Sequence, residues 1–162
     1  MPVRRRMLIL AVPTLAAAGC GFALRRNPEL PFRRIALVGF APRSPLGEEL
    51  HRALAAGVEV IEQPARADVV FEALEDARQR VVVSSTAAGQ VRELQLRVRL
   101  MFRLSTPKGR SLIAPTELLQ SRDMNYNESV ALAKEQEEAE LFRAMQGDIV
   151  AQVMRRLAAV DL

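Results

Sequence analysis

Cysteine, histidine and tryptophan are nearly missing from this 162-residue chain, which has one cysteine, one histidine and no tryptophan. A single cysteine excludes a disulfide framework within the chain, and no His, Cys or acidic residues show a metal-ligand spacing. Aromatic residues are also scarce, with six Phe and one Tyr, so Leu, Val and Ala must fill the core. Because 49% of the residues are hydrophobic, the chain still suffices for one globular domain.

The folded part of the chain has no excess of positive charge. The formal net charge is +4, but three of the 23 basic residues, Arg4, Arg5 and Arg6, lie in residues 1–19, which contain no acid. The remainder has 20 basic and 19 acidic side chains. Nucleic-acid-binding domains usually carry a strong basic excess, so the composition argues against a nucleic-acid partner.

Residues 1–19 have the pattern of a secretory signal peptide. Three arginines precede an apolar run from Met7 to Ala18, and small residues follow. The run is too short to cross a hydrocarbon core, which takes roughly 20 helical residues. The alternative, a first helix of the domain, would place three arginines beside a stripe with no polar face.

Cys20 directly follows this leader and could be a buried thiol, a nucleophile or a covalent attachment point. The preceding Ala17, Ala18 and Gly19 resemble the lipobox of bacterial lipoproteins, although the position of Ala17 more often holds leucine. The resemblance implies acylation of Cys20, with several lipid chains giving a stable anchor. The absence of aspartate at Gly21 favours the outer membrane. Residues 20–33 then read as a lipidated tether before a domain at 34–162.

The first part of that domain predicts strand, helix and strand. The β-prone run IALVGF follows Arg34, and a short amphipathic helix comes next, with Ser44 at its N-cap, Pro45 at its first position and Gly57 after its end. His51 lies near the polar edge of this helix, where we expect an exposed histidine rather than a ligand. VEVIE indicates a small strand.

Residues 67–104 predict two long strands joined near Gly89. The second strand alternates apolar and polar residues, which is typical of a strand with one face in a core. Its apolar positions are Leu94, Leu96, Val98, Leu100, Phe102 and Leu104. A turn at residues 106–110 and one further strand from Ser111 follow.

The C-terminal part predicts a long helix with Asn127 as its candidate cap. Its apolar positions recur every three or four residues, at Phe142, Met145, Ile149, Val153, Leu157 and Val160. Gly147 lies inside this predicted helix, where its presence is explained either by a close contact between the helix and the sheet or by chance. We interpret the acidic run Glu135–Glu140 as a solvated surface rather than an acid–base site. The whole predicts an α+β two-layer sandwich, a mixed four-stranded sheet with two helices packed on one face.

Two motifs, CGFALR after the lipobox and YNESVALAKEQEEAELFRAM followed by RRL, resemble the LptE family of lipopolysaccharide-assembly lipoproteins. The resemblance implies a non-enzymatic outer-membrane lipoprotein, on the periplasmic side of the inner leaflet, without a cofactor besides the lipid on Cys20. Such a protein plugs the LptD β-barrel, aids its assembly and helps deliver lipopolysaccharide to the outer leaflet. The alternative is an accessory lipoprotein of another envelope lipid-transport or secretion complex.

Basic residues are the expected contacts for the lipopolysaccharide phosphates. The lysine of the family's ALAK segment corresponds to Lys134. The family's second basic contact lies in the loop between the two long strands, where this chain reads TAAGQVRE, so Arg92 is a substitute from a shifted position or the contact is missing.

The residues add a further candidate, an arginine stripe. Arg97, Arg99 and Arg103 share the strand face opposite the apolar residues. Such a stripe is either the solvated side of a one-sided sheet or a surface for anionic lipid or acidic lumen groups. No paired acids, glycine-rich phosphate loop or nucleophile elbow supports catalysis.

Overall fold

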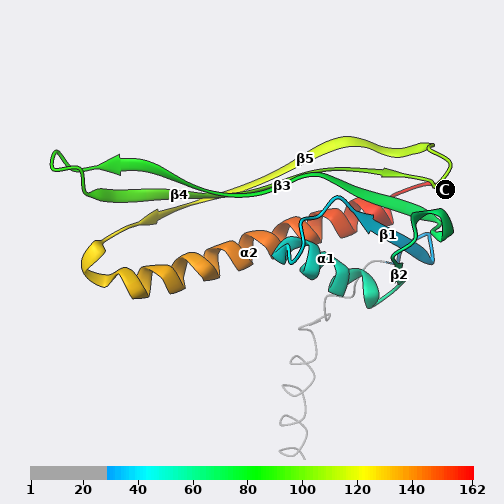
Figure 1. Cartoon of the computed structure of the whole chain (residues 1–162), viewed down its shortest axis with the longest axis horizontal. Helices are drawn as coiled ribbons and strands as arrows, with labels where there is room; N and C mark the ends of the chain where they lie inside the picture. The colour runs from blue at the N-terminus through cyan, green and yellow to red at the C-terminus, as the bar shows by residue number, and fades with distance from the viewer. Residues whose placement is uncertain (1–28) are drawn as a thin grey trace, which may run out of the picture.

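Two helices cover one face of a five-stranded sheet in the computed structural model, which describes residues 29–162 (Figure 1). In chain order the elements are β1 (Arg34–Val38), α1 (Pro45–Ala55), β2 (Glu59–Ile61), the 3₁₀ turn η2 (Pro64–Arg66), β3 (Val69–Ser85), β4 (Val91–Ser105), β5 (Ser111–Asn125), the 3₁₀ turn η3 (Glu128–Val130) and α2 (Ala131–Ala158).

The sheet is mixed, with the strand order β2-β1-β3-β4-β5. β1 runs parallel to β2 and β3, whereas β3, β4 and β5 form an antiparallel meander. The predicted α+β sandwich of two layers is confirmed. The expected strand count of four is too low, because the short VEVIE segment also joins the sheet as β2 at the edge of β1.

The hairpin of β3 and β4 extends past the beginning of α2 (Figure 1). β3 has 17 residues and α2 has 28. At about 3.3 Å per strand residue and 1.5 Å per helical residue, the strand is roughly 56 Å long and the helix roughly 42 Å. The helix therefore cannot cover the whole hairpin, and the tip around Gly89 projects from the body.

The core lies between the sheet and the helices. The alternating residues of β4 are buried as predicted, and Leu96, Val98, Leu100, Phe102 and Leu104 are each 0% exposed. The six core positions predicted for the long helix are also buried, although the last of them, Val160, lies two residues beyond the end of α2. Helix α1 adds three leucines to the core: Leu46, Leu50 and Leu54.

Polar contacts also join the sheet to α2. Arg78 on β3 donates a hydrogen bond to Gln146, and its guanidinium lies 5.1 Å from the centroid of the Phe142 ring. Arg80 pairs with Glu138 at 3.3 Å, and that glutamate side chain is only 16% exposed. The interpretation of the acidic run as a solvated surface is therefore wrong for Glu138, because this residue faces the arginine on the sheet.

The long helix begins later than predicted. Asn127 does not cap α2; its Oδ1 accepts hydrogen bonds from the backbone N–H and hydroxyl of Ser129 within the preceding 3₁₀ turn.

Gly147, in the middle of α2, lies close to α1. A Cβ at Gly147 would lie 3.4 Å from the Glu49 side chain of α1. The close neighbour of this glycine is thus the other helix, and the suggested helix-to-sheet contact is wrong.

The connection between β1 and α1 is held tightly in place. A Cβ at Gly39, whose φ is +85°, would lie 2.1 Å from the carbonyl oxygen of Ala73, so only glycine fits there. Ser44 caps α1 as predicted, since its hydroxyl accepts a hydrogen bond from the Gly47 N–H at 2.9 Å and donates one to Asp76. Arg43, in between, has a φ of +61°.

The leader, Cys20 and most of the tether lie outside the described residues, so their assignments stay predictions. Among residues 29–162, no helix combines the length and apolar character that crossing a membrane would require.

Candidate functional site

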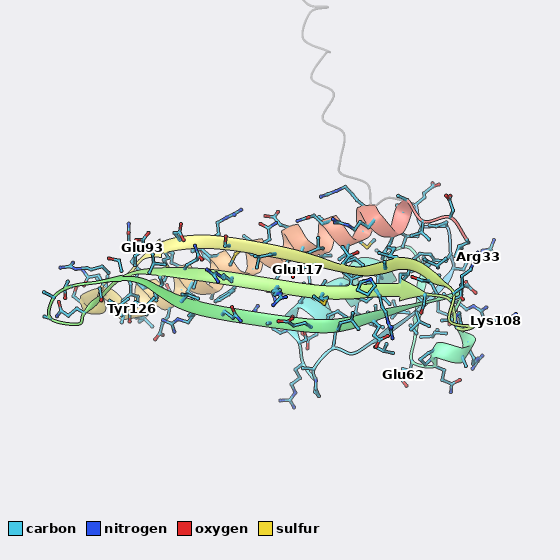
Figure 2. The ribbon with its side chains drawn as sticks, turned by 90° about the horizontal axis from the view of Figure 1, so that it is seen from above. Arg33, Glu62, Glu93, Lys108, Glu117 and Tyr126 are labelled. Atoms are coloured by element: carbon cyan, nitrogen blue, oxygen red, sulfur yellow. The ribbon has the colours of Figure 1, made fainter. Side chains whose placement is uncertain are left out.

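The arginine stripe lies on the sheet face that no helix covers, which Figure 2 shows from above. Arg99 lies between two carboxylates of the neighbouring strands, with its guanidinium 3.2 Å from Glu75 and 2.9 Å from Glu117. Antiparallel pairing produces this arrangement, because both glutamates pair with Met101 and so lie diagonally beside Arg99, one on each neighbouring strand. The positive charge of Arg99 is therefore already matched within the protein.

The other two arginines of the stripe also have partners. Arg103 contacts Glu72 at 2.6 Å, and Arg97 donates a hydrogen bond to Gln95 at 2.7 Å. Glu93 and Asp123 belong to the same face by the strand register. Acidic side chains thus outnumber the arginines on this face, and an anionic ligand would meet carboxylates there.

Arg92, the other candidate contact, is the second residue of β4 and lies directly after the turn of the β3–β4 hairpin. Its side chain is exposed, and its guanidinium makes no hydrogen bond or ion pair with those residues of 29–162 whose side chains the structure describes, a set that leaves out Glu128. Arg92 lines a cavity of about 260 Å³ together with Tyr126 and Asn127. A backbone hydrogen bond fixes the walls of this cavity, because the Tyr126 N–H donates to the Arg92 carbonyl at 2.9 Å.

Lys134 lies in the first turn of α2. This turn is at the same end of the molecule as the tip of the β3–β4 hairpin (Figure 1). The Nζ of Lys134 is 2.7 Å from Glu137, one turn further along the helix, and its side chain is 20% exposed. Such a partly exposed i, i+3 pair within a helix contributes only about a few tenths of a kcal/mol, so a stronger anion could replace Glu137.

Large apolar side chains are exposed at this end as well. Val82 and Val83 on the hairpin are each 54% exposed, and Val130 and Leu132 beside the start of α2 are 48% and 72% exposed. We call these four residues, together with Arg92 and Lys134, the hairpin-end surface. The apolar members were not found from the sequence, because their exposure depends on where the helix stops covering the hairpin.

The hairpin-end surface combines exposed apolar groups with cations. Such a combination suits an amphiphile that carries both acyl chains and anionic groups. Within residues 29–162, no three His, Cys, Asp or Glu side chains gather in a way that could hold a metal ion.

Comparison with known proteins agrees with this fold. The solution structure of an uncharacterized lipoprotein B from Nitrosomonas europaea superposes with a TM-score of 0.72 and 28% identity, covering 86% of this chain and 91% of that one. A minor lipoprotein from Acinetobacter baumannii, with a TM-score of 0.64 and 23% identity, shares the fold and covers 80% and 93% of the two chains.

Sequence relatives are equally consistent. The LPS-assembly lipoprotein LptE of Pectobacterium atrosepticum is 30% identical over 159 residues, which are 96% of this chain and 80% of the relative. That of Yersinia enterocolitica is 28% identical over 158 residues, 95% and 75% of the two chains. The model of the LptE family, described as lipopolysaccharide-assembly, matches residues 32–157.

The fold and these relatives define a small α+β lipoprotein of lipopolysaccharide assembly. The chain belongs to the LptE family. The resemblance noted in the two sequence motifs is thereby confirmed, whereas the lipid on Cys20 and the roles of Lys134, Arg92, Arg97, Arg99 and Arg103 remain predictions.

Proposed function

We propose that this chain is a non-enzymatic lipoprotein, anchored to the inner leaflet of the outer membrane through acylated Cys20. In this proposal it forms a complex with the LptD β-barrel, plugs the barrel, aids its assembly and helps to deliver lipopolysaccharide to the outer leaflet. The observation that carries the proposal is the family match over residues 32–157, nearly the whole described domain.

The open face of the sheet supports the role of a plug. Its side chains are mostly polar, and Arg99 and Arg103 are neutralised by carboxylates of neighbouring strands. The interior of a large membrane β-barrel is polar, so a polar sheet face whose Arg99 and Arg103 already have carboxylate partners fits there without burying an unpaired arginine.

The hairpin-end surface supports a contact with lipopolysaccharide. Arg92 is exposed, and the only partner of Lys134 is a weak intrahelical one, so both can bind phosphate. Exposed Leu132 and Val83 can contact acyl chains beside them. We therefore place the main lipopolysaccharide contacts at Arg92 and Lys134, with smaller contributions from Arg97, Arg99 and Arg103.

Co-purification tests the complex. An affinity-tagged full-length chain, extracted from outer membranes in mild detergent, should bring down LptD in a one-to-one ratio. Recovery of the chain with the components of another lipid-transport or secretion complex, in place of LptD, would establish the alternative function. Mass spectrometry of the same sample should show a chain that begins at acylated Cys20.

Binding of purified lipopolysaccharide tests the surface. The double variant R92Q/K134Q should bind about tenfold more weakly, because it loses two charge-assisted contacts. The matched control is K108Q/R110Q at the opposite end of the sheet, where Figure 2 labels Lys108. Equal weakening in both variants would indicate a general charge effect and contradict a specific site.

A further inference from the structure

A second surface lies beside the first turns of α1. Figure 1 shows that this helix is far from the tip of the β3–β4 hairpin. The surface is an open depression of about 430 Å³ between the β1–α1 connection and α1. Leu37 and Phe40 give it an apolar floor, and Arg43, His51 and Arg52 stand at its rim. Nothing in the proposed lipopolysaccharide contact uses these residues.

The floor of this pocket is rigid. Phe40 stacks on Phe71 with ring centroids 6.0 Å apart, and Phe71 in turn stacks on Phe102 in the core. Gly47 of α1 lets the Phe40 ring approach the helix, since a Cβ there would lie 3.0 Å from the ring. An apolar group entering the pocket would therefore meet a fixed aromatic surface.

The rim holds two cations for which the described part of the chain supplies no partner. Arg43 and Arg52 are exposed, and neither guanidinium makes a hydrogen bond or ion pair with the described side chains of residues 29–162. Glu48 is the one acidic residue among those that line the pocket. The outer sheet face differs, because Arg99 and Arg103 are matched there by carboxylates.

The backbone at Arg43 gives a second, independent observation. Its φ of +61° lies in the left-handed region, which glycine or asparagine adopts more easily than arginine. The Gly39 approach to β3 and the Ser44 contacts on either side fix this conformation. A strained arginine at the rim of a pocket is a feature that binding would explain.

We propose that this pocket docks an acidic segment of a partner protein, which places one apolar side chain over Phe40 and carboxylates on Arg43 and Arg52. Charge complementarity favours an acidic ligand. The depression, at about 430 Å³, can take an apolar side chain but is small for the several acyl chains of a glycolipid. The pocket is thus a protein-docking site separate from the hairpin-end surface.

The test uses the full-length ¹⁵N-labelled chain in mild detergent and a capped hexapeptide that alternates glutamate with phenylalanine. We expect saturable shifts of the Gly39, Gly47 and His51 amide signals. The matched peptide with glutamine in place of glutamate should bind at least about tenfold more weakly. Equal shifts with both peptides would overturn the proposal, as would shifts caused by phosphatidylglycerol vesicles or lipopolysaccharide but not by the acidic peptide.

Two variants separate binding from folding. R43G removes the cation and the backbone strain together, so the chain should melt at the same or a higher temperature yet bind the peptide about tenfold more weakly. R52Q should weaken binding by a similar factor. R66Q, an exposed arginine of η2 that does not line this pocket, is the control. Unchanged binding in both R43G and R52Q would sink the proposal.

Discussion

The guanidinium of Arg78 lies over the ring of Phe142, 5.1 Å from its centroid, and so joins the middle of the sheet to the long helix. The same guanidinium donates a hydrogen bond to the side chain of Gln146, a residue that is only 2% exposed. A polar contact thus crosses the layer boundary where the remaining contacts are mainly apolar.

Replacing this arginine should destabilise the fold. Arg78→Met keeps an apolar stem but leaves the buried Gln146 without its partner, so we expect the free energy of unfolding to fall by roughly 1–3 kcal/mol. Urea unfolding followed by circular dichroism measures the change. Arg66→Met, at an exposed position, should stay within about 0.5 kcal/mol of the unchanged protein. Equal effects of the two variants would mean that the contact contributes nothing specific.

Asp68 should make stability depend on pH in the acid range. The hydrogen bond from the Arg34 side chain, helped by the Arg34 and Arg33 backbone N–H groups, lowers the pKa of Asp68 below its ordinary value of 3.8. The folded state therefore binds this proton more weakly than the unfolded state does. Its contribution is fully present above pH 3.8 and is lost as the pH falls through the lower pKa of the folded state.

Asp68→Asn gives the measurement of this effect. The variant should be less stable than the unchanged protein at pH 7, and the gap should narrow as unfolding is repeated down to about pH 2. A gap that stays constant across this range would show that the carboxylate charge is not the cause.

Gly39 should tolerate no side chain. Gly39→Ala would place a Cβ 2.1 Å from a backbone oxygen of β3, so we expect a loss of roughly 3–5 kcal/mol, or failure to fold. Gly89→Ala is the matched control, because φ is also positive there but the space is open. It should lose only about 1–2 kcal/mol from the left-handed backbone. Thermal melting of both variants compares the two.

The exposed apolar residues at the hairpin end should matter for ligand binding and not for folding. Leu132→Ser and Val83→Ser are expected to weaken lipopolysaccharide binding severalfold while the melting temperature stays nearly unchanged, since both side chains are mostly exposed. Leu162→Ser, which changes a 52% exposed leucine at the C-terminus, is the control. Binding that is unaffected in the first two variants would remove the apolar part of the proposed surface.

The arginine stripe should contribute less than the hairpin end. Replacing Arg97, Arg99 and Arg103 together by Gln removes charges of which two are already paired with carboxylates. We expect lipopolysaccharide binding to change by less than about threefold, against about tenfold for R92Q/K134Q. A larger loss in the triple variant, at unchanged stability, would reverse this ranking.

Local patterns in the sequence determined most of the secondary structure. The strict alternation from Leu94 to Leu104 specifies one buried strand face, because successive side chains point to opposite sides of a sheet. Ser44 and Pro45 likewise specify where α1 begins, since a hydroxyl cap and a fixed φ act within one turn.

Only the tertiary structure decided which charges are matched and which surfaces stay open. Arg99 meets Glu117 because of the strand register, and Glu138 meets Arg80 because of the way the helix lies on the sheet. Neither relation follows from the neighbours of these residues along the chain. The exposure of Leu132 depends on the different lengths of hairpin and helix, and the pocket beside Arg43 depends on a backbone conformation fixed by a distant strand. Such contacts between residues far apart in sequence form only when the layers pack.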